Sequence, residues 1–456
     1  MDYKKLNLKV GLEIHRQINS HKLFCKCPSI LSDGNPDLIV KRKLRAVESE
    51  MGEKDRAAIF EMLKDKKGVY EFFNESACLI ELDEEPILGI NEEALKAVLT
   101  VAKMLNCEIF EEIIMMRKQV LDYSNTTGFQ RTGLVARNGY VKVNGNKIRI
   151  ESICIEEDSA RKIKINEKEA IYRLDRLGIP LIEITTSPDM NDAEEVKEVA
   201  SYLGMILKST GKFKSGLGTI RQDINISIKN GKRVEIKGVQ DLRNIPKIIE
   251  NEIERQLKEK ANEEVRVVNS ELKTDFLRPM PGAARMYVET DIDEINTSSL
   301  LNEVKIPRLI KDEVDNLVKK GLSENIAREI VNKGIDLDNY KLDSKLVADV
   351  LIEKPKEIRK RFKIDVKEEN LEKVLDLLKN KKINRDVITD VLIDMENDKF
   401  EISNYKKIDN KLIENEVRNL MKNNLSVKAM MGILMGKYKG KISGKELMEI
   451  IKKYEK

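Results

Sequence analysis

Strict alternation of apolar and polar residues marks the first strand that the sequence predicts. Between Leu8 and His15, one face of this strand would carry Leu8, Val10, Leu12 and Ile14, and the other would carry Lys9, Gly11, Glu13 and His15. Glu13 and His15 therefore point to the same side. The glycine beside them permits a close approach to the backbone.

Two later strand patterns also carry acidic residues. The stretch SICIEEDS ends an apolar strand in Glu156, Glu157 and Asp158, and the stretch IPLIEITTSP places Glu183 within an apolar run. A buried carboxylate is costly unless a cation or a hydrogen-bond donor compensates it. Carboxylates from separate strands suit Mg²⁺, and Mg²⁺ suits phosphate chemistry. Whether Glu156 or Glu157 is the ligand stays open, since a bulge near Glu151 would exchange their faces.

A fourth alternating stretch predicts a β-hairpin. Residues 219–229 alternate isoleucines with polar residues, and a turn at 230–232 returns the chain through RVEIKGV. A loop of three residues would place Ser227 opposite Glu235 and Asn225 opposite Lys237. One face of the hairpin would then carry a set of charged and polar groups, namely Arg221, Asp223, Asn225, Glu235 and Lys237. Such alternation is also typical of the solvated face of an antiparallel sheet.

The order of the patterns predicts an α+β protein with three domains. Strand patterns and glycine turns dominate residues 1–296, a cradle domain rich in antiparallel sheet, with helices after Asn91, from about Asn191 to Ser209, and from Ile245 to Lys260. Beyond Pro307 the period is helical. We expect an all-α helical domain over 297–400 and a small helical tail over 401–456, with breaks near Gly321, Gly334 and residues 403–405.

Composition and charge narrow the class of protein. The 456 residues are 36% charged, with a mean hydropathy of −0.43, and show neither an apolar run long enough to span a bilayer nor a signal-peptide pattern. We therefore expect a cytoplasmic protein without a membrane partner. The net charge is +4, yet residues 417–456 hold ten Lys or Arg against three Glu. This basic tail indicates either an RNA backbone contact or a solvated helix pair.

The five cysteines give a weaker signal. Cys25 and Cys27 are spaced like the start of a zinc site, but the sequence shows no second close pair, and a structural zinc site needs four close ligands. Cys25, Cys27 and Cys154 are therefore expected to be small buried residues.

Several ordered motifs resemble the GatB/GatE family, the B- and E-type subunits of tRNA-dependent amidotransferases. They are VGLEIHRQINSHKLFCKCP, RKQVLDYSNTTGFQRT, CIEEDSARK, YRLDRLGIPLIEITTSPDM, GLGTIRQDINISI and RPMPGAARMYVETDI. SNTTGFQRT and PGAARMY are more similar to the archaeal E type than to the bacterial B type. The resemblance is dense up to Asp291 and sparser beyond it.

The resemblance implies an activity. Such enzymes take glutamate misacylated onto the glutamine tRNA, activate its side chain with ATP as a γ-glutamyl phosphate, and let ammonia displace the phosphate. Residue by residue, it implies Mg²⁺ ligands at Glu13, His15, Glu156 and Glu183. Arg221, Asp223, Glu235 and Lys237 would position ATP or the acyl phosphate, with Arg221 and Asp223 among the catalytic positions. Because histidine is an unusual Mg²⁺ ligand, His15 could equally bind a softer cation or a phosphate oxygen.

The resemblance also implies partners. Ammonia would come from an asparaginase-like D-type subunit in a heterodimer or a dimer of heterodimers. The substrate would be Glu-tRNA(Gln), bound through tail lysines, namely Lys437, Lys439, Lys441 and Lys445.

One departure from the family pattern keeps alternatives open. E-type subunits normally carry a domain-sized insertion before RPMPGAARMY, whereas here only Ala261 to Phe276 fills that place. A B-type amidotransferase, acting on Asp- or Glu-tRNA, is one alternative. A tRNA-binding scaffold without activity is another, although a scaffold would not need clustered carboxylates.

Overall fold

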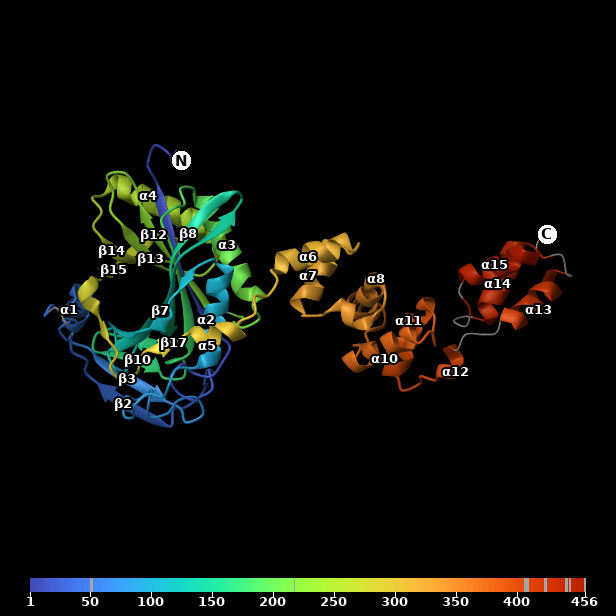
Figure 1. The fold of residues 1–456 in the computed structure, drawn as a ribbon, viewed down its shortest axis with the longest axis horizontal. Helices are drawn as coiled ribbons and strands as arrows, with labels where there is room; N and C mark the ends of the chain where they lie inside the picture. Colours follow the sequence, from blue (N-terminus) through green and yellow to red (C-terminus); the bar gives the residue numbers. More distant parts are fainter. Residues whose placement is uncertain are drawn as a thin grey trace. The chain divides into compact units, whose positions relative to one another are not determined.

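The computed structural model describes the chain except residues 50–51, 217, 406–409, 422–424, 439–441, 443 and 455–456. The chain forms two compact units, Met1–Leu309 and Ile310–Lys456, which differ in architecture. The first is built around a large sheet and the second is helical (Figure 1). The predicted α+β class is therefore confirmed. None of the helices described is both long and apolar enough to cross a membrane.

The large sheet of the N-terminal unit has β1 near its centre. Neighbouring strands follow one another in the order β15 (Thr274–Pro279), β14 (Glu264–Val268), β13 (Val234–Val239), β12 (Ile220–Ser227), β1 (Lys9–Gln17), β11 (Pro180–Thr186), β8 (Asn146–Glu157), β7 (Phe129–Val143), β6 (Met115–Gln119) and β16 (Met286–Val288). The short β4 (Glu108–Ile109) also pairs with β7. All these pairs are antiparallel except β13 with β14, which is parallel. A tight turn at Asn144 and Gly145, both with positive φ, joins β7 to β8.

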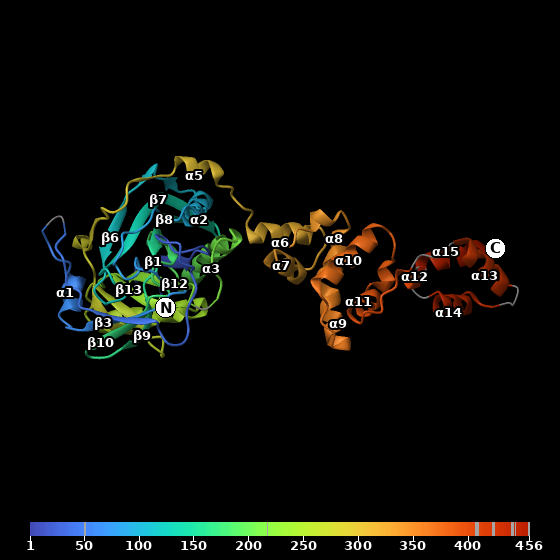
Figure 2. The same cartoon turned by 90° about the horizontal axis from the view of Figure 1, so that it is seen from below.

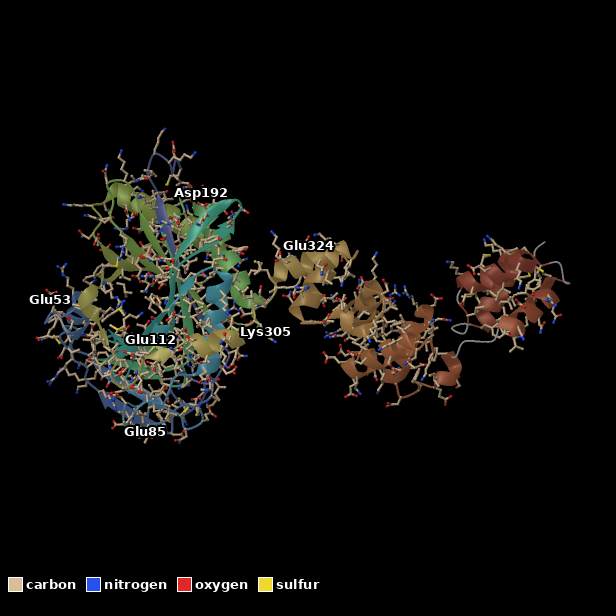
Figure 3. All side chains as sticks on the ribbon, in the orientation of Figure 1. Glu53, Glu85, Glu112, Asp192, Lys305 and Glu324 are labelled. Carbon is tan, nitrogen blue, oxygen red and sulfur yellow. The ribbon has the colours of Figure 1, made fainter. Side chains whose placement is uncertain are left out.

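Helices cover one face of this sheet and leave the other for polar groups. Leu8, Val10, Leu12 and Ile14 are at most 2% exposed, which confirms the alternation predicted for the first strand. They belong to one hydrophobic core with α2 (Glu92–Met104), α3 (Ala193–Ser209) and α4 (Ile245–Lys258). Asn91 caps α2, and Asp192, labelled in Figure 3, caps α3 by accepting hydrogen bonds from two backbone N–H groups.

The two edges of the sheet are joined by a short connection, residues 280–285, which we call the strap. β15 ends at Pro279 and β16 begins at Met286, although they lie at opposite ends of the strand order. A chain of this length spans at most about 25 Å. The sheet must therefore curl until its edges lie that close, and the curvature of its strands is visible in Figure 2. Asp55 fixes the strap by accepting a hydrogen bond of 2.8 Å from Gly282 N.

Smaller elements complete the N-terminal unit. A second sheet has the order β2 (Leu38–Arg42), β3 (Lys67–Phe72), β10 (Glu169–Arg173) and β9 (Arg161–Ile165), and β17 (Ile295–Asn296) pairs with β5 (Glu112–Ile113). Two further helices are α1 (Arg56–Met62) and α5 (Ser298–Glu303). The stretch Ala261 to Phe276 forms β14 and the start of β15, so it completes an edge of the large sheet.

The C-terminal unit contains two hydrophobic clusters. One joins α6 (Ile310–Lys319), α7 (Glu324–Asn332), α8 (Ser344–Ala348), α9 (Lys354–Phe362), α10 (Glu368–Lys379), α11 (Ile388–Glu396) and α12 (Ile402–Tyr405). The other joins α13 (Asn410–Met421), α14 (Val427–Lys437) and α15 (Gly444–Tyr454). The predicted break at 403–405 is wrong, because Tyr405 stacks on Phe400 and its hydroxyl donates to Asp394, which holds that segment as α12. The domain boundaries at 296 and 400 stay predictions.

Candidate active site

His15, Glu156 and Glu183 meet on the polar face of the large sheet, and we call them the histidine cluster. His15 of β1 lies directly opposite Glu183 of β11, and its Nε2 is 2.9 Å from Glu183 Oε2 and 3.9 Å from Glu156 Oε2. Lys118 of β6 borders the cluster, with its Nζ 2.6 Å from Glu156 Oε1. One donor atom from each of His15, Glu156 and Glu183 lies within 4.8 Å of the others, so the three could hold one cation.

The electrostatics of the histidine cluster favour ionised groups. Burial raises the pKa of Glu183, but the charge of Lys118 and the hydrogen bond with His15 lower it by a larger amount. The pKa of Glu183 is therefore well below its ordinary value. Burial lowers the pKa of His15, while Glu183 more than reverses that effect, so His15 holds its proton more tightly than usual. A cation bound here would have to displace that proton.

A bulge in β8 decides which of the two adjacent glutamates faces the histidine cluster. Ser152 pairs with Thr185 and Ile150 with Thr186, so Glu151 is the extra residue, and the buried positions shift from Ile148 and Ile150 to Ile153 and Ile155. Glu156 consequently joins Glu183 on the polar face. Glu157 turns to the other face, where Arg131 donates to it from its backbone N at 3.1 Å and from its guanidinium.

Glu13, Asp223 and Glu235 form a second group, which we call the carboxylate cluster. Glu13 pairs with Asp223 across β1 and β12, and donor oxygens of the three acids lie within 4.8 Å of one another. Lys237 Nζ is 2.7 Å from Asp223 Oδ2, and Asn225 Nδ2 donates to Glu13 at 2.9 Å. Burial, then the charges of Glu235 and Glu183, raise the pKa of Glu13 to about 7. One lysine does not neutralise three acids, so the carboxylate cluster has room for a further cation.

The hairpin of β12 and β13 has the predicted face but not the predicted register. Ile226 pairs with Val234, and Asn225 lies opposite Glu235, not opposite Lys237. The loop is therefore longer than the three residues expected, because parity fixes only whether the number of loop residues is odd or even. A bulge between Gln222 and Ile224 then moves the next pair to Gln222 and Val239. Asp223 and Lys237 still meet on the polar face.

The buried acid Asp158 fixes the position of the Arg221 side chain. Its Nη2 donates to Asp158 Oδ1 at 3.0 Å, and Gln17 donates to the other oxygen of Asp158 at 2.7 Å. The charge of Asp158 is the main reason that the pKa of Arg221 is raised. Because Arg221 lies opposite His15 in the sheet, it borders the histidine cluster.

Sequence reasoning named Asp158 only as one of three acids at the end of a strand, without its arginine partner, and did not single out Lys118 or Glu289. Glu289 is buried just beyond β16 and accepts from Arg117 and from Arg131, at 2.7 Å in the latter case. The motifs RKQV and CIEEDSARK contained the signal for Lys118 and Asp158. What was missing was the spatial order of β6, β7 and β8, which local periodicity does not give.

A third group, which we call the thiol cluster, lies apart from the other two. Cys78 and Glu81 join Cys25 and Cys27, and one donor atom from each of the four lies within 4.8 Å of the others. Cys25 is buried as expected, whereas Cys27 and Cys154 are only partly buried. The partners that the sequence did not show come from a loop more than fifty residues away, which folding brings beside Cys25 and Cys27. Three sulfurs and one carboxylate oxygen are a donor set that suits zinc. Cys154 lies elsewhere, on the polar face of β8 opposite Glu183.

The predicted tRNA-binding lysines are only partly described. Lys437 ends α14 and forms an ion pair of 2.5 Å with Glu416, while Lys445 is exposed on α15. Lys439 and Lys441 lie outside the described residues.

Comparison with known proteins identifies the family to which this large sheet belongs. The family model of the GatB/GatE catalytic domain matches residues 8–303, and the chain belongs to this family. The E subunit of the glutamyl-tRNA(Gln) amidotransferase of Methanocaldococcus jannaschii is 53% identical over 274 residues, which is 60% of this chain and 44% of that protein. The E subunit of Archaeoglobus fulgidus is 52% identical over 56% of this chain and 42% of its own length. That of Methanococcus maripaludis strain S2 is 43% identical over 73% and 49%. The chain thus spans about half the length of the curated relatives that it matches.

Proposed function

We propose that the chain is the ATP-dependent subunit of a Glu-tRNA(Gln) amidotransferase, which activates the tRNA-bound glutamate as a γ-glutamyl phosphate and amidates it with ammonia. One observation carries the proposal: two groups of acidic ligands lie side by side on the central strands of one sheet, each bordered by a lysine. Phosphoryl transfer to a carboxylate brings two anions together, so it needs concentrated positive charge and fixed geometry.

The donor sets fit Mg²⁺. His15, Glu156 and Glu183 would hold one ion, and Glu13, Asp223 and Glu235 would hold a second. Mg²⁺ prefers oxygen ligands at about 2.0 to 2.1 Å, and five of these six donors are carboxylates. The raised pKa of Glu13 supports this assignment, because the acid lacks sufficient neutralising charge from the protein alone. When bound, Mg²⁺ neutralises phosphoryl oxygens and orients them.

Positively charged side chains of this chain would contact the phosphate and the anionic substrate. Lys118 and Lys237 each contact one of the two clusters. Either lysine could therefore bind a phosphate oxygen that enters between the acids. Arg221 is fixed by Asp158, and among the described residues its guanidinium makes no other hydrogen bond, so its remaining N–H groups could position an anionic substrate. These roles follow from position and charge.

Ammonia would come from a separate asparaginase-like D-type subunit, in the cytoplasm, in a heterodimer or a dimer of heterodimers. Support comes from the two histidines of the sequence. His15 is engaged with Glu183, and His21 contacts backbone carbonyls and Asn91. Across the described part of the chain, neither imidazole ring is hydrogen-bonded to a Ser, Thr or Cys side chain, as an amidase nucleophile activated by histidine requires. An acyl phosphate exposed to water would hydrolyse, which favours delivery by direct docking.

The test is transamidation of Glu-tRNA(Gln) by the purified chain with ATP, Mg²⁺ and free ammonium. We expect Gln-tRNA(Gln) to form with ammonium, and not with asparagine or glutamine unless an asparaginase-like partner is added. No product with ammonium would favour the tRNA-binding scaffold instead. Product from asparagine or glutamine alone would reveal a second active site in this chain.

A further inference from the structure

The strap and the edge strand before it carry two arginines toward the polar face. Arg278 of β15 pairs with Val265 of β14, and Val265 pairs with Glu235 of β13. Residues paired across a sheet point to the same side, so Arg278 faces the same side as Glu235. Two strand spacings separate their backbones, which corresponds to about 10 Å. A long arginine side chain can cover much of that distance.

Arg285 approaches from the opposite edge. It immediately precedes Met286, which pairs with Lys118 of β6, and its Nε donates to Gln119 O at 3.2 Å. Arg285 therefore lies next to the strand that supplies the lysine of the histidine cluster. The curl of the sheet brings it close to both clusters at once: the charges acting on its guanidinium include Glu156 of the first and Glu235 of the second.

Arg278 and Arg285 are also close enough for their charges to interact, and neither is paired directly with an acid in the described residues. Burial and then Arg278 lower the pKa of Arg285, which shows that the two like charges interact. In the described residues neither guanidinium forms a salt bridge, and Arg278 Nε is buried without a hydrogen-bond partner. Lys118, Lys237 and Arg221 each contact a carboxylate instead. Adjacent unpaired cations are unfavourable unless an anion lies between them.

We propose that Arg278 and Arg285 are a phosphate-binding pair, which holds a phosphoryl group of the nucleotide between the two acidic clusters. The inference deepens the proposed function and depends on it. A phosphoryl group matches the arrangement because its oxygens can accept from two guanidinium forks at once. The same group can also face cations held by the acids on its other side. A single carboxylate has too few oxygens to serve all these partners.

Binding of ATP with Mg²⁺, measured by calorimetry on the full chain, tests the pair. We expect R278Q and R285Q each to weaken ATP binding by about 10- to 100-fold, the range for a charge-assisted contact to phosphate. Affinity for adenosine should not change. R285K, which keeps the charge but not the fork, should lie between R285Q and the parent. R243Q is the matched control, because Arg243 is an exposed arginine of the same unit that is paired with Asp241, and it should bind ATP like the parent.

Thermal unfolding without nucleotide gives an independent readout. Loss of one of two like charges should leave the melting temperature unchanged or raise it, whereas loss of a structural arginine would lower it. Lower melting temperatures with ATP affinity intact would overturn the proposal. If the parent binds ATP and both variants bind it equally, the phosphate-binding pair is wrong and the proposed function stands. A parent chain that binds no nucleotide would overturn both.

Discussion

Glu183 is a partly buried carboxylate of the histidine cluster. It lies between Lys118 and His15, and both hold its pKa well below the ordinary value. Glu183→Gln keeps the size and part of the hydrogen bonding, so the fold should persist. Formation of the acyl phosphate should fall at least about 100-fold, as for the loss of one preorganised electrostatic partner. Single-turnover measurement of glutamyl phosphate with ATP and Mg²⁺ checks this.

Glu151→Gln is the control for that variant, since Glu151 is exposed on β8 at the bulge. It should behave like the parent. Normal acyl phosphate formation by the Glu183 variant at ordinary Mg²⁺ would remove Glu183 from the active site.

The thiol cluster leads to a prediction about metal content. Burial and Glu81 raise the pKa of Cys78 to about 12, and burial and Glu81 also raise that of Cys25, so without a cation both thiols keep their protons. We expect the chain purified from zinc-containing medium to hold about one zinc ion, and Cys78→Ser to lose it. Elemental analysis measures this. Cys107→Ser, outside the thiol cluster and hydrogen-bonded to Leu105 O, should keep the metal. A metal-free parent chain would contradict the assignment.

Periodicity predicted which residues share a face but not which residues on neighbouring strands meet. It placed Glu13 and His15 correctly on the polar side of β1. The pattern also indicates which of Glu156 and Glu157 lies on the polar face. The apolar positions change from even to odd residue numbers between Ile150 and Ile153, where the bulge lies. The four expected Mg²⁺ ligands nonetheless separate into two clusters, with Glu13 in one and the other three in the second. That separation depends on strand order.

At the scale of elements, a buried charge network fastens the edge strand β16. Glu289 follows β16 and accepts from Arg117 of β6 and Arg131 of β7, and its backbone N donates to Met115 O at 2.9 Å. Burial raises the pKa of Glu289, but Arg117 and Arg131 lower it more, so it falls below its ordinary value of 4.5. The network therefore ties three strands together through one carboxylate.

This network should make the stability of the N-terminal unit depend on pH. Since the pKa of Glu289 is lowered by folding, its stabilisation is fully present above pH 4.5 and declines as the pH falls through the lower, folded value. Glu289→Gln should lower the free energy of unfolding by about 1.5 to 3 kcal/mol at pH 7, because both arginines lose a charge-assisted hydrogen bond, while Arg131 keeps Glu157 and Arg117 keeps Asp291. It should also flatten the fall in stability below pH 4.5. Urea unfolding across pH measures both effects.

An exposed pair provides the comparison for Glu289. Glu303 is 61% exposed and pairs with Lys96, so Glu303→Gln should change stability by less than about 1 kcal/mol. Equal losses from the two substitutions would show that burial of Glu289 contributes nothing.

The elements themselves were easier to predict than their connections. Caps and periodicity indicated α2, α3 and α4 within a few residues. The strap was not predicted, because nothing local in residues 280–285 indicates that the strands on either side lie at opposite edges of the sheet. The helix α12 was missed for a related reason, since a tertiary contact of Tyr405 stabilises it.

At the scale of the whole molecule, the tail should contribute to tRNA affinity through charge. Truncation after Tyr405 keeps α12 and removes residues 406–456. We expect weaker tRNA binding and a smaller dependence of affinity on salt, by about 0.7 to 0.9 in the logarithmic slope for each phosphate that the tail no longer neutralises. ATP binding should not change, because the N-terminal unit has its own core. Titration of tRNA at several salt concentrations measures the slope, and Lys445→Glu provides a point variant. An unchanged slope would mean that the tail lysines are merely solvated.

The central position of β1 bears on how the protein is made. Glu13 pairs with Thr185 on one side and Asp223 on the other, so during synthesis β1 must wait for partners about two hundred residues later. At typical rates of synthesis this delay is roughly 10 to 40 s. Throughout it, the apolar side chains of Val10, Leu12 and Ile14 lack the neighbours that bury them in the folded unit. The strand that contributes one ligand to each cluster, Glu13 and His15, is therefore also a segment that a chaperone would protect during synthesis.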